Sequence, residues 1–113
     1  MPKLDELTPA EARTRVDAGE AVLIDVREPF EHRDEHIPGA HLVALSAFDP
    51  AEVARLAGDR TPIFQCRSGK RSADAAHRFA TDDATVVHLA GGILACKEAG
   101  LANERAASAP KVD

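Results

Sequence analysis

Residues 63–79, IFQCRSGKRSADAAHRF, place a cysteine between a short apolar run and a polar segment of helical composition. Ile63 to Gln65 is typical of a buried strand, and Ser72 to Ala80 is predicted to form a helix. Cys66 would then lie at the carboxyl end of a strand, in front of a loop that contains Gly69. Open α/β sheets form their ligand sites at these strand ends. The pattern therefore predicts a functional site at Cys66.

The rest of the chain alternates in the same way between apolar runs and helical segments. Further strands are predicted at Ala21–Asp25, His41–Val43 and Thr85–Leu89. Helices are predicted between the cap Thr8 and Gly19, and at Glu28–Glu35, Ala51–Ala57 and Gly92–Ala99. This order predicts an α/β sandwich with a mainly parallel central sheet and helices on both faces. Residues 103–113, NERAASAPKVD, lack apolar periodicity and are predicted to be a flexible tail.

Composition narrows the class of protein. The 113 residues are 44% hydrophobic and 29% charged, which is typical of one globular domain. The formal net charge of -5 argues against nucleic acid as a partner. No apolar run approaches the roughly 18–20 residues of a membrane span, and the N-terminal residues do not resemble an export signal. Two cysteines are too few for a disulfide scaffold, so a cytoplasmic protein with free thiols is expected.

The residues after Cys66 favour a negatively charged sulfur. Arg67, Lys70 and Arg71 follow it within five positions, and backbone N–H groups of a loop and a helix N-terminus also attract anions. The thiolate is the nucleophile, and a pKa lowered by two units corresponds to about 2.7 kcal/mol. Gly69 suits a tight loop that needs a positive φ. The alternative is a buried structural cysteine with solubilising cations around it; we favour the nucleophile, with an anionic substrate.

Four motifs resemble the rhodanese-like (sulfurtransferase) family. CRSGKRS at Cys66–Ser72 is similar to its C-x-x-G-x-R active-site loop. DVREPFE at Asp25–Glu31 and HIPGA at His36–Ala40 resemble its two N-terminal signatures. LAGGILACKEAGL at Leu89–Leu101 is similar to its closing segment. The order and spacing agree over residues 4–102, which we take as the domain.

The resemblance implies a single-domain sulfurtransferase of the thiosulfate type, in which Cys66 alternates between thiolate and persulfide. The donor would be a small anion, thiosulfate or a persulfide, and the acceptor a thiol, cyanide or a protein. No cofactor and no metal are expected. The residues implied in substrate binding are Arg67, Ser68, Gly69, Lys70, Arg71 and Ser72. Those implied as supporting scaffold are Asp25, Arg27 and His36.

Three other interpretations use the same residues. Cysteine phosphatases and arsenate reductases need five residues between Cys and Arg, whereas four separate Cys66 from Arg71. HRDEH at His32–His36 formally matches a zinc motif, but Pro38 truncates the helix there and no strong third ligand is evident. A non-catalytic rhodanese-like module remains the main alternative, although such modules typically lack the cysteine.

Cys96 lies where members of the family commonly carry a tryptophan, and this chain has neither Trp nor Tyr. The simpler interpretation is a small buried hydrophobic residue. The other is a resolving thiol that attacks the Cys66 persulfide to form a disulfide, which requires Cα atoms within roughly 7 Å. Both interpretations stay open at this point.

Overall fold

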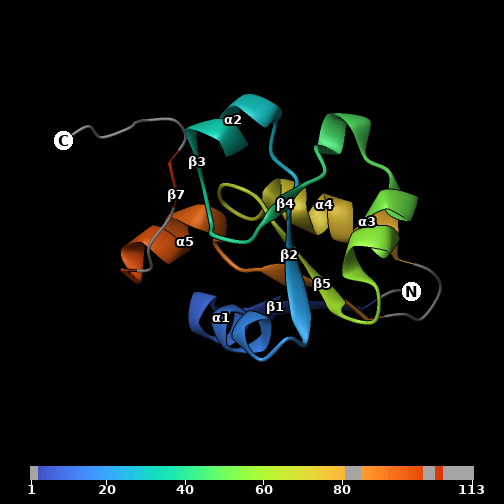
Figure 1. Cartoon of the computed structure of the whole chain (residues 1–113), viewed down its shortest axis with the longest axis horizontal. Coiled ribbons are helices and arrows are strands. Elements are labelled where there is room, and N and C mark those ends of the chain that lie inside the picture. The colour runs from blue at the N-terminus through green and yellow to red at the C-terminus, as the bar shows by residue number, and fades with distance from the viewer. Residues whose placement is uncertain (1–2, 81–84, 101–103, 106–113) are drawn as a thin grey trace.

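The computed structural model describes residues 3–80, 85–100 and 104–105, and its centre is a five-stranded parallel sheet (Figure 1). The strand order is β1-β6-β5-β2-β4. The strands are β1 (Lys3–Leu7), β2 (Ala21–Asp25), β4 (His41–Leu42), β5 (Thr61–Gln65) and β6 (Thr85–Leu89). All pairings within this sheet are parallel, as the alternation of apolar runs and helical segments predicted.

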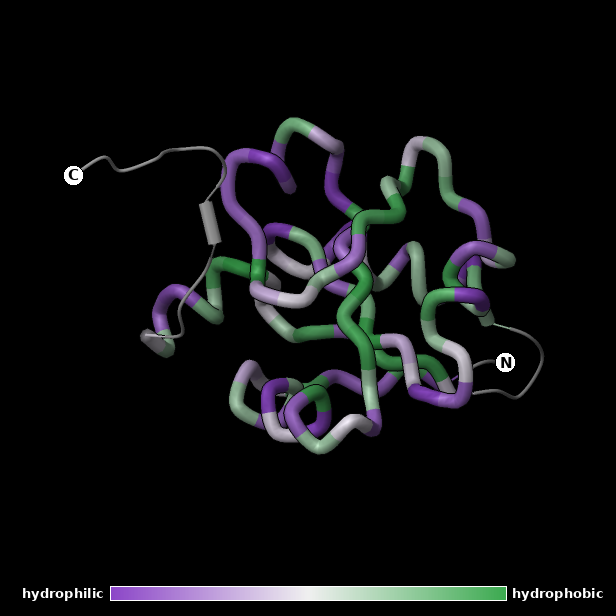
Figure 2. The backbone as a smooth tube through the Cα atoms, viewed as in Figure 1, coloured by the Kyte–Doolittle hydropathy of each residue, from purple (hydrophilic) through white to green (hydrophobic). Residues whose placement is uncertain are grey.

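The central strands are apolar because helices cover both faces of the sheet. Every residue of β2 is buried, and so are the last three of β5 and the last four of β6. Parallel strands buried on both sides are continuous hydrophobic runs, and Figure 2 shows β2 as a hydrophobic stretch at the centre of the molecule. The register places Phe64 of β5 opposite Ile24 of β2 and His88 of β6.

Two hydrophobic cores lie on the two faces of the sheet. One contains Val22, Ile24, Phe64 and Cys66, and receives α3 (Pro50–Ala57) and α4 (Lys70–Phe79). The other contains Leu23, Ile63, Leu89 and Cys96, and receives α1 (Pro9–Asp17) and α5 (Gly92–Glu98). Odd and even strand positions separate between the two cores, as the two-residue period of a strand requires. The predicted α/β sandwich is thereby confirmed.

Local signals explain where the helices begin. Thr8 caps α1 through a reciprocal capping box with Glu11, and Asp49 accepts the amide of Ala51 at the start of α3. The short helix α2 (Pro29–Asp34) also begins with a proline, and a 3-10 turn covers Leu45–Ala47. The bounds of these three helices agree with the predicted ones to within one or two residues, whereas the 3-10 turn was not predicted.

Some elements were not predicted. Strand β1 was missed, and α4 begins at Lys70 rather than Ser72. A second, two-stranded sheet pairs β3 (Glu35–His36) with β7 (Glu104–Arg105) in antiparallel fashion. Glu104 and Arg105, which belong to the predicted tail, are therefore paired in a strand. The rest of 103–113 lies outside the described residues. Within the residues that the structure describes, no helix has both the length and the hydropathy needed to cross a membrane.

Candidate active site

Cys66 lies directly after β5, in the loop that leads into α4, as the sequence predicted. The loop turns at Gly69, whose φ of +117° lies in a region that residues with a side chain rarely adopt, so the predicted positive φ is confirmed. The backbone amide of Gly69 donates a hydrogen bond to the Cys66 sulfur over 3.0 Å. The loop is therefore shaped around the sulfur atom.

The second partner of the sulfur is Ser72, which is in the first turn of α4. Its Oγ lies 3.6 Å from Cys66 Sγ and 3.1 Å from the carbonyl oxygen of Gly69. The Ser72 side chain is fully buried, so it contributes to the floor of the site rather than to its surface. Of the predicted substrate-binding side chains, those of Arg67, Ser68 and Lys70 are exposed.

The pKa of Cys66 is lowered although only 1% of the residue is exposed. Burial alone would raise the pKa, and it is the largest single influence. It is outweighed by hydrogen bonds from the Ser72 hydroxyl and from the backbone amides of Ser72, Gly69 and Ser68. The direction matches the expectation, and so does the part assigned to loop amides, whereas the loop cations do not appear among the main causes.

The closing GG segment holds the loop from the other side. The amides of Ile93 and Leu94, in the first turn of α5, donate to the carbonyls of Cys66 (2.9 Å) and Arg67 (3.2 Å). The side-chain amide of Gln65 also donates to the Cys66 carbonyl, over 2.8 Å. A Cβ at Gly92 would collide with both loop carbonyls, so only glycine fits there. With these carbonyls held from outside, the loop amides face the sulfur.

Arg71 is occupied by an ion pair that the sequence analysis did not predict. Its guanidinium donates twice to the carboxylate of Glu31, over 2.7 and 3.0 Å. This hydrogen bond lowers the pKa of Glu31 to about 2. It also raises the pKa of Arg71, to which the charge on Cys66 adds a smaller contribution. Arg71 therefore joins α4 to α2, and part of its charge is balanced before any substrate binds.

Behind the loop, a buried network joins the two predicted N-terminal signatures. Asp25, fully buried, accepts the amide, Nε and Nη2 of Arg27 at 2.8–3.0 Å, and lies 2.8 Å from Nδ1 of His32. Arg27 also donates to the carbonyl of Glu35 over 2.6 Å. His36 stacks on His32 with ring centroids 4.1 Å apart. The scaffold role of Asp25, Arg27 and His36 remains a prediction, with which these contacts agree.

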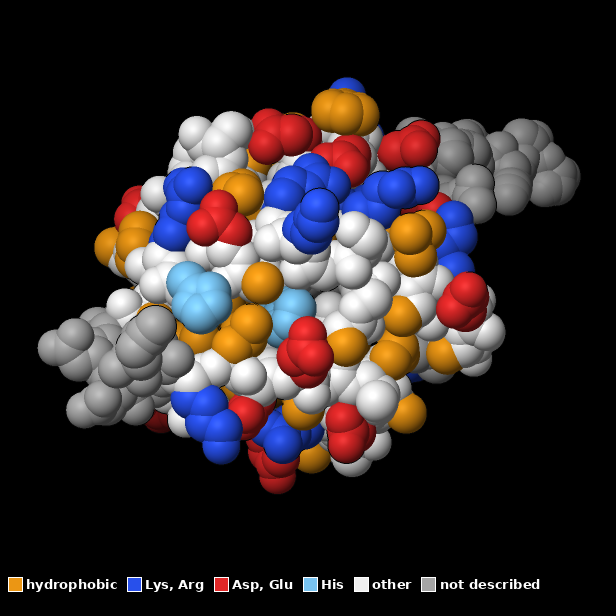
Figure 3. All heavy atoms as spheres, turned by 180° about the vertical axis from the view of Figure 1, so that it is seen from behind, with side chains coloured by type: hydrophobic (Ala, Val, Ile, Leu, Met, Phe, Trp, Pro, Cys, Tyr) orange, Lys and Arg blue, Asp and Glu red, His pale blue; other side chains and the backbone are white. Residues whose placement is uncertain are grey.

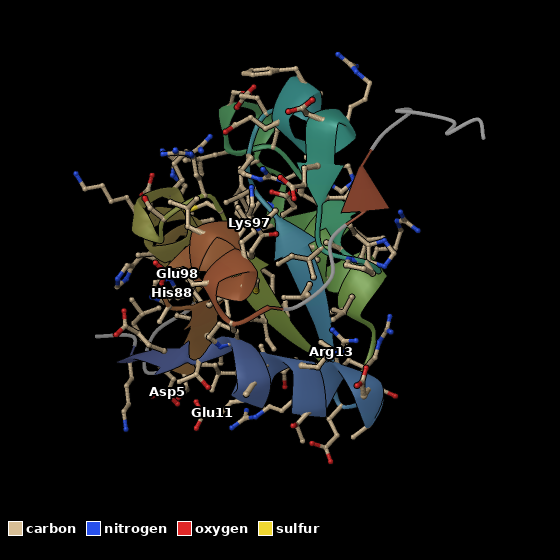
Figure 4. All side chains as sticks on the ribbon, turned by 90° about the vertical axis from the view of Figure 1, so that its left-hand side faces the viewer. Asp5, Glu11, Arg13, His88, Lys97 and Glu98 are labelled. Carbon is tan, nitrogen blue, oxygen red and sulfur yellow. The ribbon has the colours of Figure 1, made fainter. Side chains whose placement is uncertain are left out.

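His88 is a site residue that the sequence analysis missed. It lies on β6, with Nδ1 2.8 Å from Ser72 Oγ and Nε2 3.0 Å from Oε2 of Glu6 on β1. Figure 4 shows His88 between α4 and β1. A polar residue within a buried strand beside the strand of Cys66 was the available signal, but β1 was not recognised and so no partner was evident.

The HRDEH histidines have other partners, and no metal centre emerges around them. His36 Nδ1 lies 2.8 Å from the carbonyl oxygen of His32. Among residues 3–80, 85–100 and 104–105, no group of three or more His, Cys, Asp or Glu side chains is placed to hold a metal ion.

Cys96 lies in the core on the opposite face of the sheet from Cys66, and both cysteines are free. It lines an apolar pocket of about 120 Å³ together with Ala12, Val16, Leu23 and Leu89. Burial raises the pKa of Cys96. These surroundings suit a small hydrophobic residue, and the resolving role remains a prediction.

Comparison with known proteins places the chain in a family. It matches the rhodanese-like domain family over residues 8–99. It is 43% identical over 94 residues to "Probable adenylyltransferase/sulfurtransferase MoeZ" of Mycobacterium tuberculosis, covering 79% of this chain but only 24% of that protein. A protein named sulfurtransferase from Allochromatium vinosum is 33% identical over 86 residues, which are 75% of this chain and 79% of the relative.

The solved structures agree. The crystal structure of a thiosulfate sulfurtransferase from Pseudomonas aeruginosa aligns with a TM-score of 0.78 and 26% identity, over 90% of this chain and 20% of that one. The chain therefore spans a quarter or less of the length of MoeZ and of the Pseudomonas protein. Since the match covers most of the chain, including the loop around Cys66 and the GG segment that holds it, this protein belongs to the rhodanese-like domain family.

Proposed function

We propose that this protein is a sulfurtransferase that carries sulfane sulfur on Cys66. The observation that carries the proposal is the hydrogen bonding of Cys66 Sγ by the Gly69 amide at 3.0 Å and by Ser72, which lowers the pKa of a buried thiol. A sulfur atom held as an anion is the form that attacks and the form that leaves. Relatives named as sulfurtransferases support this interpretation.

With thiosulfate as donor, the reaction has two displacements. The Cys66 thiolate attacks the outer sulfur of thiosulfate, a new S–S bond forms, and sulfite leaves with the electron pair of the broken bond. The persulfide anion that results keeps the single negative charge of the site. An acceptor such as cyanide or a thiolate then takes the outer sulfur and releases the Cys66 thiolate. The same amides that stabilise the thiolate would stabilise the persulfide.

Charge around the loop supports an anionic donor. Arg67 and Lys70 are exposed beside the loop, whereas Arg71 is paired with Glu31. A pocket of about 240 Å³ adjoins the loop and is lined by Arg67 and Lys97 together with acidic side chains. On the face shown in Figure 3, basic side chains likewise lie next to acidic ones. This mixed charge suits a small anion, thiosulfate or a persulfide, better than a long polyanion such as nucleic acid.

A non-catalytic rhodanese module is the second candidate, because one observation favours it. Only 1% of Cys66 is exposed, so little of this residue is accessible to a sulfur donor in the structure. The cytoplasmic location and the free thiols belong to the main proposal, since a reducing compartment keeps both cysteines available.

The test is to incubate the purified protein with thiosulfate and measure its intact mass. Sulfur transfer predicts a gain of one sulfur atom that cyanide removes, with thiocyanate as the product. Cys66→Ser should abolish the gain, and the matched variant Cys96→Ser should keep it. Mercaptopyruvate and a small-molecule persulfide, tested in the same way, would show which donor is preferred.

The outcomes separate the candidates. Absence of a mass gain on wild-type protein with every sulfur donor would support the non-catalytic module. Turnover of a phosphoester such as p-nitrophenyl phosphate, without sulfur uptake, would instead support the phosphatase interpretation and contradict the proposal.

A further inference from the structure

A continuous chain of side-chain contacts leads from the Cys66 sulfur across the sheet to the surface. Cys66 Sγ lies 3.6 Å from Ser72 Oγ, which lies 2.8 Å from Nδ1 of His88. Nε2 of His88 lies 3.0 Å from a carboxylate oxygen of Glu6. His88 is 4% exposed as a side chain and Glu6 63%, so the chain joins a buried sulfur to a solvated carboxylate. The sulfurtransferase reaction, as proposed above, gives His88 and Glu6 no task.

The strand register brings these groups together. His88 is the direct partner of Glu6 on β1 and of Phe64 on β5, so its ring lies on the face of the sheet covered by α4. The Cε1 edge of the ring lies over Gly69, where an added Cβ would be 3.8 Å away. Among the described residues, Glu6 of β1 is the charged group that contacts the ring. Helix α4 contributes Ser72, and the loop contributes Cys66 beyond it.

The protonation state of His88 decides which group donates in each of these hydrogen bonds. A carboxylate is an acceptor, so Nε2 of His88 must donate to Glu6. In neutral His88, Nδ1 then has no proton and must accept the single hydroxyl proton of Ser72. In protonated His88, Nδ1 donates to Ser72, whose own proton is free for another acceptor. Because the Cys66 thiolate is charged, the Ser72 hydroxyl donates to it in preference to the Gly69 carbonyl oxygen.

We propose that His88 is a positioning residue that, held by Glu6, directs the Ser72 hydroxyl toward the Cys66 sulfur. The proton of the Cys66 thiol passes to Ser72 Oγ while the Ser72 hydroxyl proton passes to Nδ1 of His88. The S–H bond and one O–H bond break, and one O–H bond and one N–H bond form. Ser72 is unchanged, Cys66 becomes a thiolate that accepts from Ser72, and His88 becomes an imidazolium facing Glu6.

This inference builds on the proposed function, but it concerns the ionisation of Cys66 and can be tested without a sulfur donor. The measurement is the rate at which iodoacetamide alkylates Cys66, followed across pH by mass spectrometry of the Cys66 peptide. Ser72→Ala removes the link between the sulfur and the imidazole. The midpoint of the pH profile should rise by about one pH unit, with a roughly tenfold slower reaction at neutral pH.

His88→Leu should give a similar rise, and the double variant should be no worse than Ser72→Ala alone. This non-additivity is the decisive result, because His88 acts on the sulfur only through Ser72. His88→Asn, which keeps a side-chain amide able to donate to Ser72, should restore part of the effect. Glu6→Gln should also raise the midpoint, because the amide no longer favours the imidazolium. The rise should be smaller than in His88→Leu, which removes the imidazole itself. His77→Gln, on the exposed face of α4, is the matched histidine control and should change nothing.

The proposal is overturned if His88→Leu leaves the midpoint in place, or if its effect is as large in the Ser72→Ala background as in the wild type. If His88→Leu fails to fold, the comparison of His88→Asn with Glu6→Gln in both backgrounds gives the same decision. If wild-type protein takes up sulfur from thiosulfate but His88→Leu has an unaltered pH profile, the role of His88 is rejected and the proposed function is kept. If wild-type protein takes up no sulfur but the variants have the expected pH profiles, the proposed function is rejected and the role of His88 is kept.

Discussion

The two cysteines of this protein are both buried, but their pKa values are shifted in opposite directions. Cys66 is 1% exposed and Cys96 is 3% exposed, yet the pKa of the first is lowered and that of the second is raised. Burial acts against ionisation at both. The difference is that Cys66 Sγ faces the Gly69 amide and Ser72, whereas Cys96 faces an apolar pocket between α1 and the sheet. Donors, rather than depth, decide which thiol becomes an anion.

The two thiols also differ in where they lie relative to a helix. The loop of Cys66 precedes α4, so the N–H groups at the start of that helix are directed toward the sulfur. Cys96 lies within α5, beyond the first turn whose amides donate to the Cys66 loop, so its thiol does not face the N–H groups of a helix start. A position before a helix and a position within one thus give the same side chain different chemistry.

The largest expected effect is a difference in alkylation rate between the two thiols. At pH 7, iodoacetamide should modify Cys66 at least about tenfold faster than Cys96, because a larger fraction of Cys66 is thiolate. Peptide-resolved mass spectrometry over a time course measures both rates in one sample. In denaturant the two rates should converge, since the loop no longer exists; equal rates in the native protein would remove the contrast.

Gly92→Ala should raise the pKa of Cys66, as burial does for Cys96, and destabilise the fold. The added Cβ would collide with the carbonyls of Cys66 and Arg67, and φ at this position is +58°. We expect a loss of about 3 kcal/mol in the free energy of unfolding and a higher pKa of Cys66, because the loop amides are displaced from the sulfur. Chemical denaturation and the alkylation profile measure the two effects.

Gly19→Ala is the matched control for that variant. Gly19 follows the C-terminal end of α1 and also has a positive φ, +77°, but nothing lies within 4 Å of the position that a Cβ would take. It should lose only about 1 kcal/mol, from backbone strain alone, and leave the pKa of Cys66 unchanged. Equal losses for the two alanine variants would mean that close packing of α5 on the loop does not support the site.

The contrast between the cysteines also shows how far sequence reasoning extends. The strand, loop and helix around Cys66 were predictable because the signals are local: an apolar run, a glycine that needs positive φ, and a polar segment of helical composition. The partners of that loop were not. His88 meets Glu6 across 82 residues and Arg71 meets Glu31 across 40. Neither contact has a local signal.

Strand β1 illustrates the physical reason. Its sequence, KLDEL, lies at the edge of the sheet, and four of its five residues are partly or fully exposed, so it lacks the hydrophobic run of a buried strand. Only pairing with β6 makes it a strand, and that pairing also brings Glu6 to His88. The Cys66 pKa has a similar limit: loop amides and loop cations were both expected to favour the thiolate, but a sequence does not show which amides are directed at the sulfur.

Glu31→Gln tests the ion pair between Glu31 and Arg71, the cation whose pKa responds to the charge on Cys66. The pKa of Glu31 is lowered from 4.5 to about 2, so the native state binds fewer protons than the unfolded state between these values. The ion pair with Arg71 therefore stabilises the fold fully above pH 4.5, and this stability is lost as pH falls toward 2. Because Arg71 is 35% exposed, we expect about 1–2 kcal/mol after screening.

The measurement is the free energy of unfolding of both proteins from pH 7 to pH 2. Wild type should be the more stable at pH 7, and the two curves should meet near pH 2. With Arg71 freed from Glu31, the alkylation midpoint of Cys66 should also move slightly lower, while Cys96 should be unaffected. A constant difference between the curves at every pH would contradict the ion-pair contribution.

Cys96→Met has the smallest expected effect, and it tests the second cysteine directly. The pocket of about 120 Å³ beside Cys96 has space for a longer apolar side chain. Filling it should add about 0.5–1 kcal/mol, or roughly 2–4 °C in Tm, because more apolar surface is buried without a new polar group. Sulfur uptake by Cys66 should be unchanged. A longer lifetime of the Cys66 persulfide in this variant would instead identify Cys96 as a resolving thiol, since a thioether cannot attack the persulfide to form a disulfide.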